Sequence, residues 1–235
     1  DLNTLKKAPG AAGTIFLQKY SMSKTIEHIK NQWGQNTKVV NPIGLSGSDE
    51  LIMAIKDLTG KDIPEGLAVE RGQLVDAIAD SYYHIYGKRF AINGDPDLAL
   101  GLTRFILELG GIPKIVLVTN ATKKFEKEIK QIFSAFQVED ECEVYVGKDM
   151  WHLRSLLFSN PVDYILGNTF AKLLTKDTGI PSIRIGFPIF DRHHLHRYPI
   201  IGYKGGVNLL TWIVNKILDD IDEKTKDSPN YDKVR

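Results

Sequence analysis

Short apolar runs alternate along the chain with longer stretches in which apolar residues recur every three or four positions. The short runs predict strands, and the longer stretches predict amphipathic helices. We expect strands at residues 14–17, 38–40, 89–93, 114–119, 143–146, 164–166 and 182–185, and helices at 21–33, 48–59, 64–86, 97–109, 123–136, 150–158, 170–175 and 205–224. This alternation is typical of βαβ units, so the predicted fold class is α/β, with Rossmann-like parallel sheet layers flanked by helices.

Residues at the helix ends support these limits. Ser21 or Ser23 can cap the first helix, which Gly34 ends, and Ser48 can cap the second, which Gly60 ends. The chain then divides into three parts. We expect a partial α/β region with a long connecting helix at 1–87, a Rossmann-like α/β domain at 88–190, and a histidine-rich loop with the C-terminal helix at 191–235.

Composition and charge exclude several classes of protein. The chain has 235 residues with 43% hydrophobic and 25% charged, which is ordinary for a globular domain. Its 30 Lys and Arg balance 29 Asp and Glu, so the net charge gives no reason to expect a nucleic acid or membrane partner. The apolar runs are strand-sized, far below the roughly 20 residues of a membrane helix, and the first 13 residues lack the apolar core of a secretion signal. We therefore expect a cytoplasmic protein.

A single cysteine limits metal chemistry. Cys142 has no partner for an intramolecular disulfide. Zinc and iron–sulfur sites held by thiolates use several cysteines, so this chain cannot build one from its own thiolates.

The turn Gly94-Asp95-Pro96-Asp97 follows a predicted strand and opens a helix. Backbone N–H groups at such a position can hold a small anion. The same residues are explained by helix capping, with Asp95 as N-cap and Pro96 in the first helical position. The turn lacks the G-x-G-x-x-G pattern of dinucleotide-binding sites, and the whole chain lacks the G-x-x-x-x-G-K-[ST] pattern of P-loop sites. These absences disfavour a nicotinamide or ATP enzyme.

Two acidic residues and a histidine-rich segment are further candidates. Asp76 and Asp80 lie four residues apart on a predicted helix, so they share one face and could hold a hard cation together with another oxygen ligand, or could simply be solvated. The segment Asp191–Arg197 contains His193, His194 and His196, which could bind a metal, act as acid and base, pack at a subunit interface or donate to buried backbone carbonyls.

Arg154 lies in the segment Trp151-His152-Leu153-Arg154, at the start of another predicted helix. Its guanidinium is suited to pair with a carboxylate across a domain interface. His152, beside a tryptophan, is more typical of packing.

Four segments, taken in order, resemble the β subunit of nitrogenase component 1, the molybdenum-iron, vanadium-iron or iron-iron protein. They are residues 70–76 (ERGQLVD), 94–97 (GDPD), 147–156 (GKDMWHLRSL) and 186–197 (GFPIFDRHHLHR). The resemblance runs from about Lys24 to Arg235 and covers the C-terminal half of such a subunit. The short connection at 177–181 is more similar to the vanadium or iron-only β subunits.

The resemblance implies an oxidoreductase complex rather than an independent enzyme. Its expected partners are a nitrogenase α subunit, a second β subunit and an ATP-driven iron protein that supplies electrons for reducing dinitrogen to ammonia. The family's β subunit shares the P-cluster (8Fe-7S) with the α subunit through cysteines in its N-terminal part. The iron-molybdenum, iron-vanadium or iron-only cofactor belongs to the α subunit. We therefore expect no catalytic residue and no cofactor on this chain.

The resemblance also bears on the two candidate sites. Asp76 and Asp80 match acids that help to hold a cation between two β subunits, whose other ligands come from the N-terminal part of the second β chain. We expect this metal site to be empty or weak in the present chain. The histidine-rich segment matches one that packs at subunit contacts, which favours an interface role.

The predicted function is therefore structural. The chain supports the P-cluster region and the αβ/αβ contacts, and it exposes an apolar surface where the other half of the subunit belongs. Two alternatives are a subunit of the scaffold on which nitrogenase cofactor is assembled and a stand-alone Rossmann-like protein that binds a small anion at Gly94–Asp97.

Overall fold

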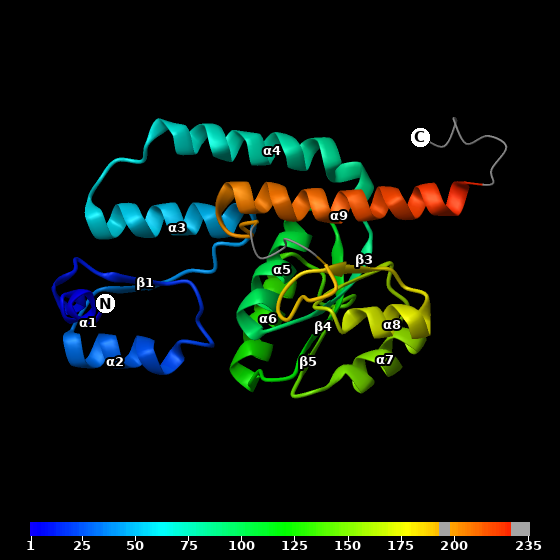
Figure 1. Cartoon of the computed structure of the whole chain (residues 1–235), viewed down its shortest axis with the longest axis horizontal. Helices are drawn as coiled ribbons and strands as arrows, with labels where there is room; N and C mark the ends of the chain where they lie inside the picture. The colour runs from blue at the N-terminus through cyan, green and yellow to red at the C-terminus, as the bar shows by residue number, and fades with distance from the viewer. Residues whose placement is uncertain (193–197, 227–235) are drawn as a thin grey trace.

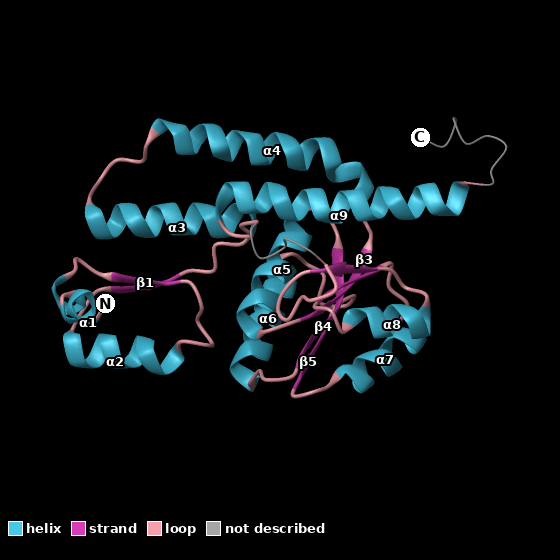
Figure 2. Cartoon of the chain, viewed as in Figure 1, coloured by secondary structure: helices cyan, strands magenta, loops and turns pink. Residues whose placement is uncertain are grey.

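The computed structural model describes residues 1–192 and 198–226, which form two parallel sheets of unequal size (Figures 1 and 2). The smaller sheet pairs β1 (Thr14–Phe16) with β2 (Thr37–Val39). The larger has the order β5-β4-β3-β6-β7. Its strands are β3 (Arg89–Asn93), β4 (Ile112–Val118), β5 (Glu143–Val146), β6 (Tyr164–Gly167) and β7 (Ser182–Arg184). The predicted α/β class with parallel strands is confirmed.

The helices follow the predicted alternation, with two short additional elements at the N-terminus. These are α1 (Leu2–Lys6) and the 3-10 helix η1 (Ala8–Gly10). The remaining helices are α2 (Ser23–Trp33), α3 (Gly44–Thr59), α4 (Glu65–Ile85), α5 (Pro96–Glu108), α6 (Lys123–Ala135), α7 (Met150–Ser159), α8 (Ala171–Thr178) and α9 (Gly202–Thr225). None of the helices in the described part of the chain is long and apolar enough to cross a membrane.

Helices cover both faces of the larger sheet (Figure 2). In β3, Phe90 and Ile92 contact the layer formed by α5, α6 and α9, whereas Ala91 contacts the layer formed by α7 and α8. All three side chains are 0% exposed. A strand that is buried on both faces has apolar residues at successive positions. This explains why residues 90–92 form a continuous apolar run in the sequence.

In the larger sheet, the chain places later strands on both sides of β3. From β3 the chain adds β4 and then β5 on one side, and it returns to add β6 and β7 on the other. Ligands of open parallel sheets bind outside the carboxyl ends of the strands at such a reversal. A ligand site is therefore expected beside the residues that follow β3, β6 and β7.

The longest helices form a separate layer. Figure 1 shows α4 lying along α9, and α9 also contacts α3. Leu74 of α4 is 0% exposed and lies so close to α9 that a Cβ on Gly206 would approach its Cδ2 atom to 2.8 Å. The glycine allows the two backbones to approach each other.

The predicted caps of the first two helices are wrong. Ser48 lies inside α3, where its hydroxyl donates to the Gly44 carbonyl at 2.6 Å. Free amides in the first turn of α3 are instead satisfied by Glu108, which accepts from Leu45 N at 2.8 Å and Ser46 N at 3.2 Å. At α2, the N-cap residue is Met22, and no side-chain cap forms.

Candidate functional site

A cavity of about 960 Å³ lies beside the carboxyl ends of β3 and β7. One wall is β1 with the residues that follow it, and the opposite walls are the turn after β3, the segment after β7, the residues just before α9 and Trp212 within that helix. Most of its lining is apolar. The apolar residues include Ile15, Phe16, Leu17, Ile43, Leu98, Ile185, Ile189, Ile200 and Trp212.

The turn after β3 has the predicted helix start. Asp95 is the N-cap residue of α5 and Pro96 occupies its first turn, although the Asp95 side chain makes no capping hydrogen bond. The acid that forms bonds is Asp97, which is 5% exposed. It accepts from Tyr20 N at 2.9 Å, Ser21 N at 3.0 Å and Ser21 Oγ at 2.9 Å. A buried, fully engaged carboxylate in this first helical turn disfavours a small anion there.

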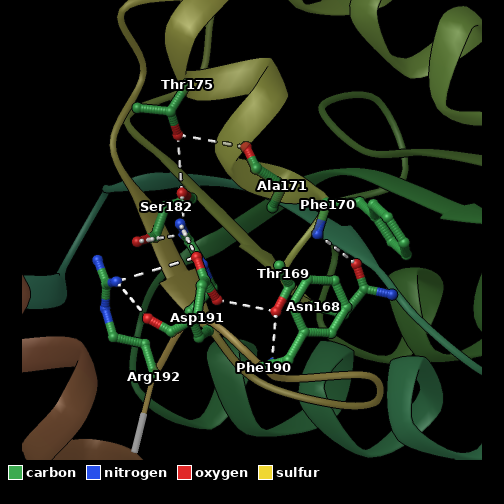
Figure 3. Close-up of polar contacts among 10 residues, drawn as sticks. Asn168, Thr169, Phe170, Ala171, Thr175, Ser182, Phe190, Asp191 and Arg192 are labelled. Atoms are coloured by element: carbon green, nitrogen blue, oxygen red, sulfur yellow. Dashed lines mark hydrogen bonds and ion pairs between the residues drawn. The ribbon is translucent and has the colours of Figure 1, made fainter.

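Figure 3 shows the polar network that fixes the segment after β7. Asp191 accepts from Arg184 Nη2 at 3.1 Å, from Arg184 Nε at 3.2 Å and from Thr169 Oγ1 at 2.8 Å. The Thr169 hydroxyl accepts in turn from Phe190 N at 3.0 Å. Burial by itself would raise the pKa of Asp191, but the hydrogen bonds from Arg184 and Thr169 and the arginine charge together lower it below its usual value.

Only the first two residues of the histidine-rich segment are among those described. Asp191 is held in the ion pair, and Arg192 is largely exposed, with its Nη1 donating to the Asp191 carbonyl at 2.7 Å. His193, His194 and His196 lie outside the described residues. Their predicted interface role stays a prediction.

Asp76 and Asp80 are both exposed on α4, and neither lines the cavity. In the described part of the chain, no group of three or more His, Cys, Asp or Glu side chains is arranged to hold a metal ion. The described residues therefore offer two carboxylates at this position and no third ligand. The cation site stays a prediction.

Cys142 is unsuited to hold an iron–sulfur cluster. It is 6% exposed, and burial, together with the charge of Glu141, raises the pKa of its thiol to about 12. Cluster ligands are thiolates, and an inert buried thiol does not become one readily. The residues present therefore do not fit the P-cluster that the resemblance implies for a whole complex.

Arg154 pairs with a carboxylate, but one that lies within the same predicted region, 88–190. Its Nε lies 2.6 Å from Asp177 Oδ2 on the neighbouring α8, and its guanidinium carbon lies 5.9 and 5.0 Å from the ring centroids of Trp151 and Phe158. The expectation of a contact across a domain interface is wrong for this pair. The ring of His152 packs near Tyr145, at 5.4 Å between centroids.

Sequence reasoning missed Arg184. The only local signal was that Arg184, a charged residue, stands between two isoleucines in the predicted strand 182–185. In the structure, β7 ends with Arg184. Its partner Asp191 was identified, but as part of the histidine-rich segment. Two charged residues of the cavity are engaged, Arg184 by Asp191 and Asp97 by Tyr20 and Ser21, whereas Asp95 is exposed and makes no capping bond. The rest of the lining is mostly apolar, which suits packing rather than acid–base chemistry.

A parallel, doubly covered sheet with its cavity at the strand ends defines a Rossmann-like α/β protein. The sequence pattern of the family described as nitrogenase component 1 type oxidoreductase matches residues 1–218. The chain belongs to this family.

Curated relatives agree with this assignment. The chain is 50% identical over 229 residues to a nitrogenase molybdenum-iron protein beta chain of Nostoc sp. strain PCC 7120, covering 96% of this chain and 45% of the relative. It is 42% identical over 243 residues to the corresponding chain of Azotobacter vinelandii, covering 98% and 46%. The chain thus spans about half the length of the curated relatives it matches. These relatives are molybdenum-iron proteins and lend no support to the vanadium or iron-only subtype.

Solved structures give the same result. A chain of nitrogenase Cp1 at pH 6.5 superposes with a TM-score of 0.90 at 34% identity, covering 94% of this chain and 48% of that one. A chain of nitrogenase Cp1 at pH 5 is 15% identical, with a TM-score of 0.71, and shares the fold.

Proposed function

We propose that this chain serves as the C-terminal half of a nitrogenase component 1 β subunit, in a cytoplasmic oxidoreductase complex that reduces dinitrogen to ammonia. In this proposal it is a structural part. It holds the P-cluster half of β against an α subunit, contributes to contacts between the two αβ halves, and works with electrons delivered by an ATP-driven iron protein.

The observation that carries the proposal is the close match of fold and sequence over only half of each relative. The TM-score of 0.90 covers 94% of this chain but 48% of the matched structure. The chain's own residues agree with a supporting role, because Cys142 is buried and Arg184 and Asp97, which line the cavity, already have hydrogen-bond partners. In this proposal, cluster ligands and the iron-molybdenum cofactor come from other polypeptide segments.

The two alternatives receive less support. The relatives named above are β chains of molybdenum-iron proteins, which favours the nitrogen-reducing complex over a cofactor-assembly scaffold. A stand-alone anion-binding protein would need free donors at the start of α5, where Asp97 places a buried carboxylate.

Reconstitution tests the proposed function. The chain is purified under anoxia alone, and also after co-expression with a nitrogenase α subunit and the N-terminal part of the Nostoc β chain. Iron and acid-labile sulfide are measured in both samples. We expect no bound iron on the isolated chain and clustered iron in the complex. Stoichiometric iron on the isolated chain, or no complex at all, would contradict the proposal.

We also propose that Asp76 and Asp80 contribute two carboxylates to a cation site shared with a second β chain. Both are exposed on one face of α4, four residues apart, which is the spacing that brings two side chains together on a helix. Calcium binding to the reconstituted complex is expected to fall in the Asp76→Asn variant and to be unchanged in Glu65→Gln, which alters an exposed acid at the start of the same helix. Equal binding by all three proteins would refute this role.

A further inference from the structure

Three exposed lysines, Lys123, Lys124 and Lys127, lie at the beginning of α6 and form the lysine face of this helix. With 3.6 residues per turn, they lie on the side opposite the buried Phe125 and Ile129. The free amides of a first helical turn carry partial positive charge, so cations placed there weaken a helix. The stability of α6 therefore does not account for these lysines.

The two acids of α6 do not neutralise the lysine face, because both are engaged elsewhere. Glu126 accepts from Lys130 Nζ at 2.6 Å. Glu128 accepts from Lys19 Nζ at 2.7 Å and also from the Tyr20 hydroxyl. In the described part of the chain, no acid forms an ion pair with a lysine of this face. The face thus keeps three positive charges without a counter-charge.

A segment of opposite charge follows the other end of α6. Its acids, Glu139, Asp140 and Glu141, are exposed and form the acidic segment. The amides of Glu141 and Cys142 both donate to the Val138 carbonyl, at 3.0 and 3.1 Å, which fixes the turn. None of the three acids forms an ion pair with another described residue. Acids near the C-terminal end of a helix face its partial negative charge, so they do not stabilise α6 either.

The two charged sets are spaced for pairing between two copies of the chain. Helix α6 has 13 residues, so its ends lie about 20 Å apart. At about 0.1 M salt, charges separated by more than about 10 Å are largely screened, and the two sets of one chain do not neutralise each other. Two antiparallel α6 helices, related by a two-fold axis, would set the lysine face of each copy against the acidic segment of the other. Gln131 and Ser134, which lie between the two sets, are exposed and uncharged.

We propose that the chain self-associates through α6, as an antiparallel pair in which the lysine face of each copy binds the acidic segment of the other. Opposite charges steer the two copies together and fix their orientation. A second copy is the occupant because one chain carries both charged sets, at matching distances from Gln131. Figure 1 shows α6 on the other side of α9 from α4, so this contact is separate from a contact at Asp76 and Asp80 and does not rest on the proposed function.

Sedimentation equilibrium at two salt concentrations tests the contact. Exposed ion pairs are individually weak, so we expect dimers with a dissociation constant on the order of 100 µM. This constant should rise about tenfold between about 50 mM and 500 mM sodium chloride, because salt screens exposed charges. Association through apolar surface is not weakened by salt in this way.

Charge reversal of each set gives the matched comparison. Lys124→Glu/Lys127→Glu should be monomeric, because acids then face acids across the contact. Glu139→Lys/Asp140→Lys should be monomeric for the corresponding reason. Both changes agree with the helix dipole and should leave α6 folded. An equimolar mixture of the two variants should form a heterodimer, because every reversed charge then meets its opposite.

A control variant separates this contact from net charge. Lys56→Glu/Lys61→Glu makes the same change in net charge at the end of α3 and should dimerise as the unmodified chain does. A monomeric unmodified chain, dimers that persist in both reversed variants, a mixture that stays monomeric, or a monomeric control would each overturn the inference. Binding of a polyglutamate peptide by a chain that stays monomeric would assign the lysine face to an acidic protein and overturn it as well.

Discussion

Replacing Asp191 with asparagine should destabilise the fold although it keeps the shape of the side chain. The Asp191 carboxylate faces Arg184 at 3.1 Å, and the two side chains are 14% and 8% exposed. Asparagine leaves the arginine charge buried without a counter-charge. Breaking a buried pair in this way costs about 3–5 kcal/mol. Because Asp191 keeps some contact with solvent, we expect a loss of about 2–3 kcal/mol.

Urea denaturation followed by far-UV circular dichroism measures this loss. Asp191→Asn and Arg184→Met should each lower the midpoint without changing the slope. The double variant Arg184→Met/Asp191→Leu should lose less than the sum of the single effects, because it removes both charges together. A cost below about 0.5 kcal/mol for Asp191→Asn, or simple additivity in the double variant, would refute the reasoning.

The same pair predicts a dependence on pH. The folded-state pKa of Asp191 is lowered, so its contribution to stability is present above the pKa of the unfolded chain and is lost as pH falls through the folded-state pKa. The stability difference between the unmodified chain and Asp191→Asn should therefore be complete at neutral pH and shrink below about pH 4. A difference that stays constant down to pH 3 would contradict an ionised Asp191 as the cause.

Three other changes test packing and reactivity. Leu74→Ala should cost about 2–5 kcal/mol in urea denaturation, because the side chain is fully buried against α9, whereas the exposed neighbour Val75→Ala should cost far less. Glu108→Gln should cost about 1 kcal/mol by weakening the cap of α3, and an unchanged midpoint would argue against that cap. Cys142 should react with Ellman's reagent only after unfolding, since it is buried and its thiol pKa is raised to about 12; rapid reaction in the native protein would contradict its burial.

Strands and helices of the larger sheet were predictable because their signals are local. The apolar run 90–92 lies between Gly87 and Gly94, and β3 occupies the predicted residues 89–93. Helix α5 begins with Pro96, as predicted, because the fixed φ angle of proline suits the first position of a helix. Elsewhere the observed limits of the strands differ from the predicted ones by a residue or two. For example, β4 begins at Ile112 rather than at the predicted residue 114. Ends of elements depend on neighbouring strands as well as on local sequence.

The candidate site was predictable only in part. The turn 94–97 was correctly interpreted as a helix start, but the sequence did not indicate that Asp97 holds Tyr20 and Ser21, which lie 77 and 76 residues earlier. Ser48 was misassigned for the same reason. The amides at the start of α3 find their acceptor in Glu108, more than sixty residues away.

The sequence by itself determined the α/β class, the order of the elements and the resemblance to nitrogenase component 1, since apolar periodicity and short motifs act within a few residues. Only the tertiary structure decided which charged side chains pair, where the cavity lies and that β1 pairs with β2. Those features depend on segments far apart in the chain being brought together, as when Arg104 of α5 reaches Glu50 of α3. Hydrogen bonds and ion pairs of this kind act over a few ångströms in space, whatever the distance in sequence.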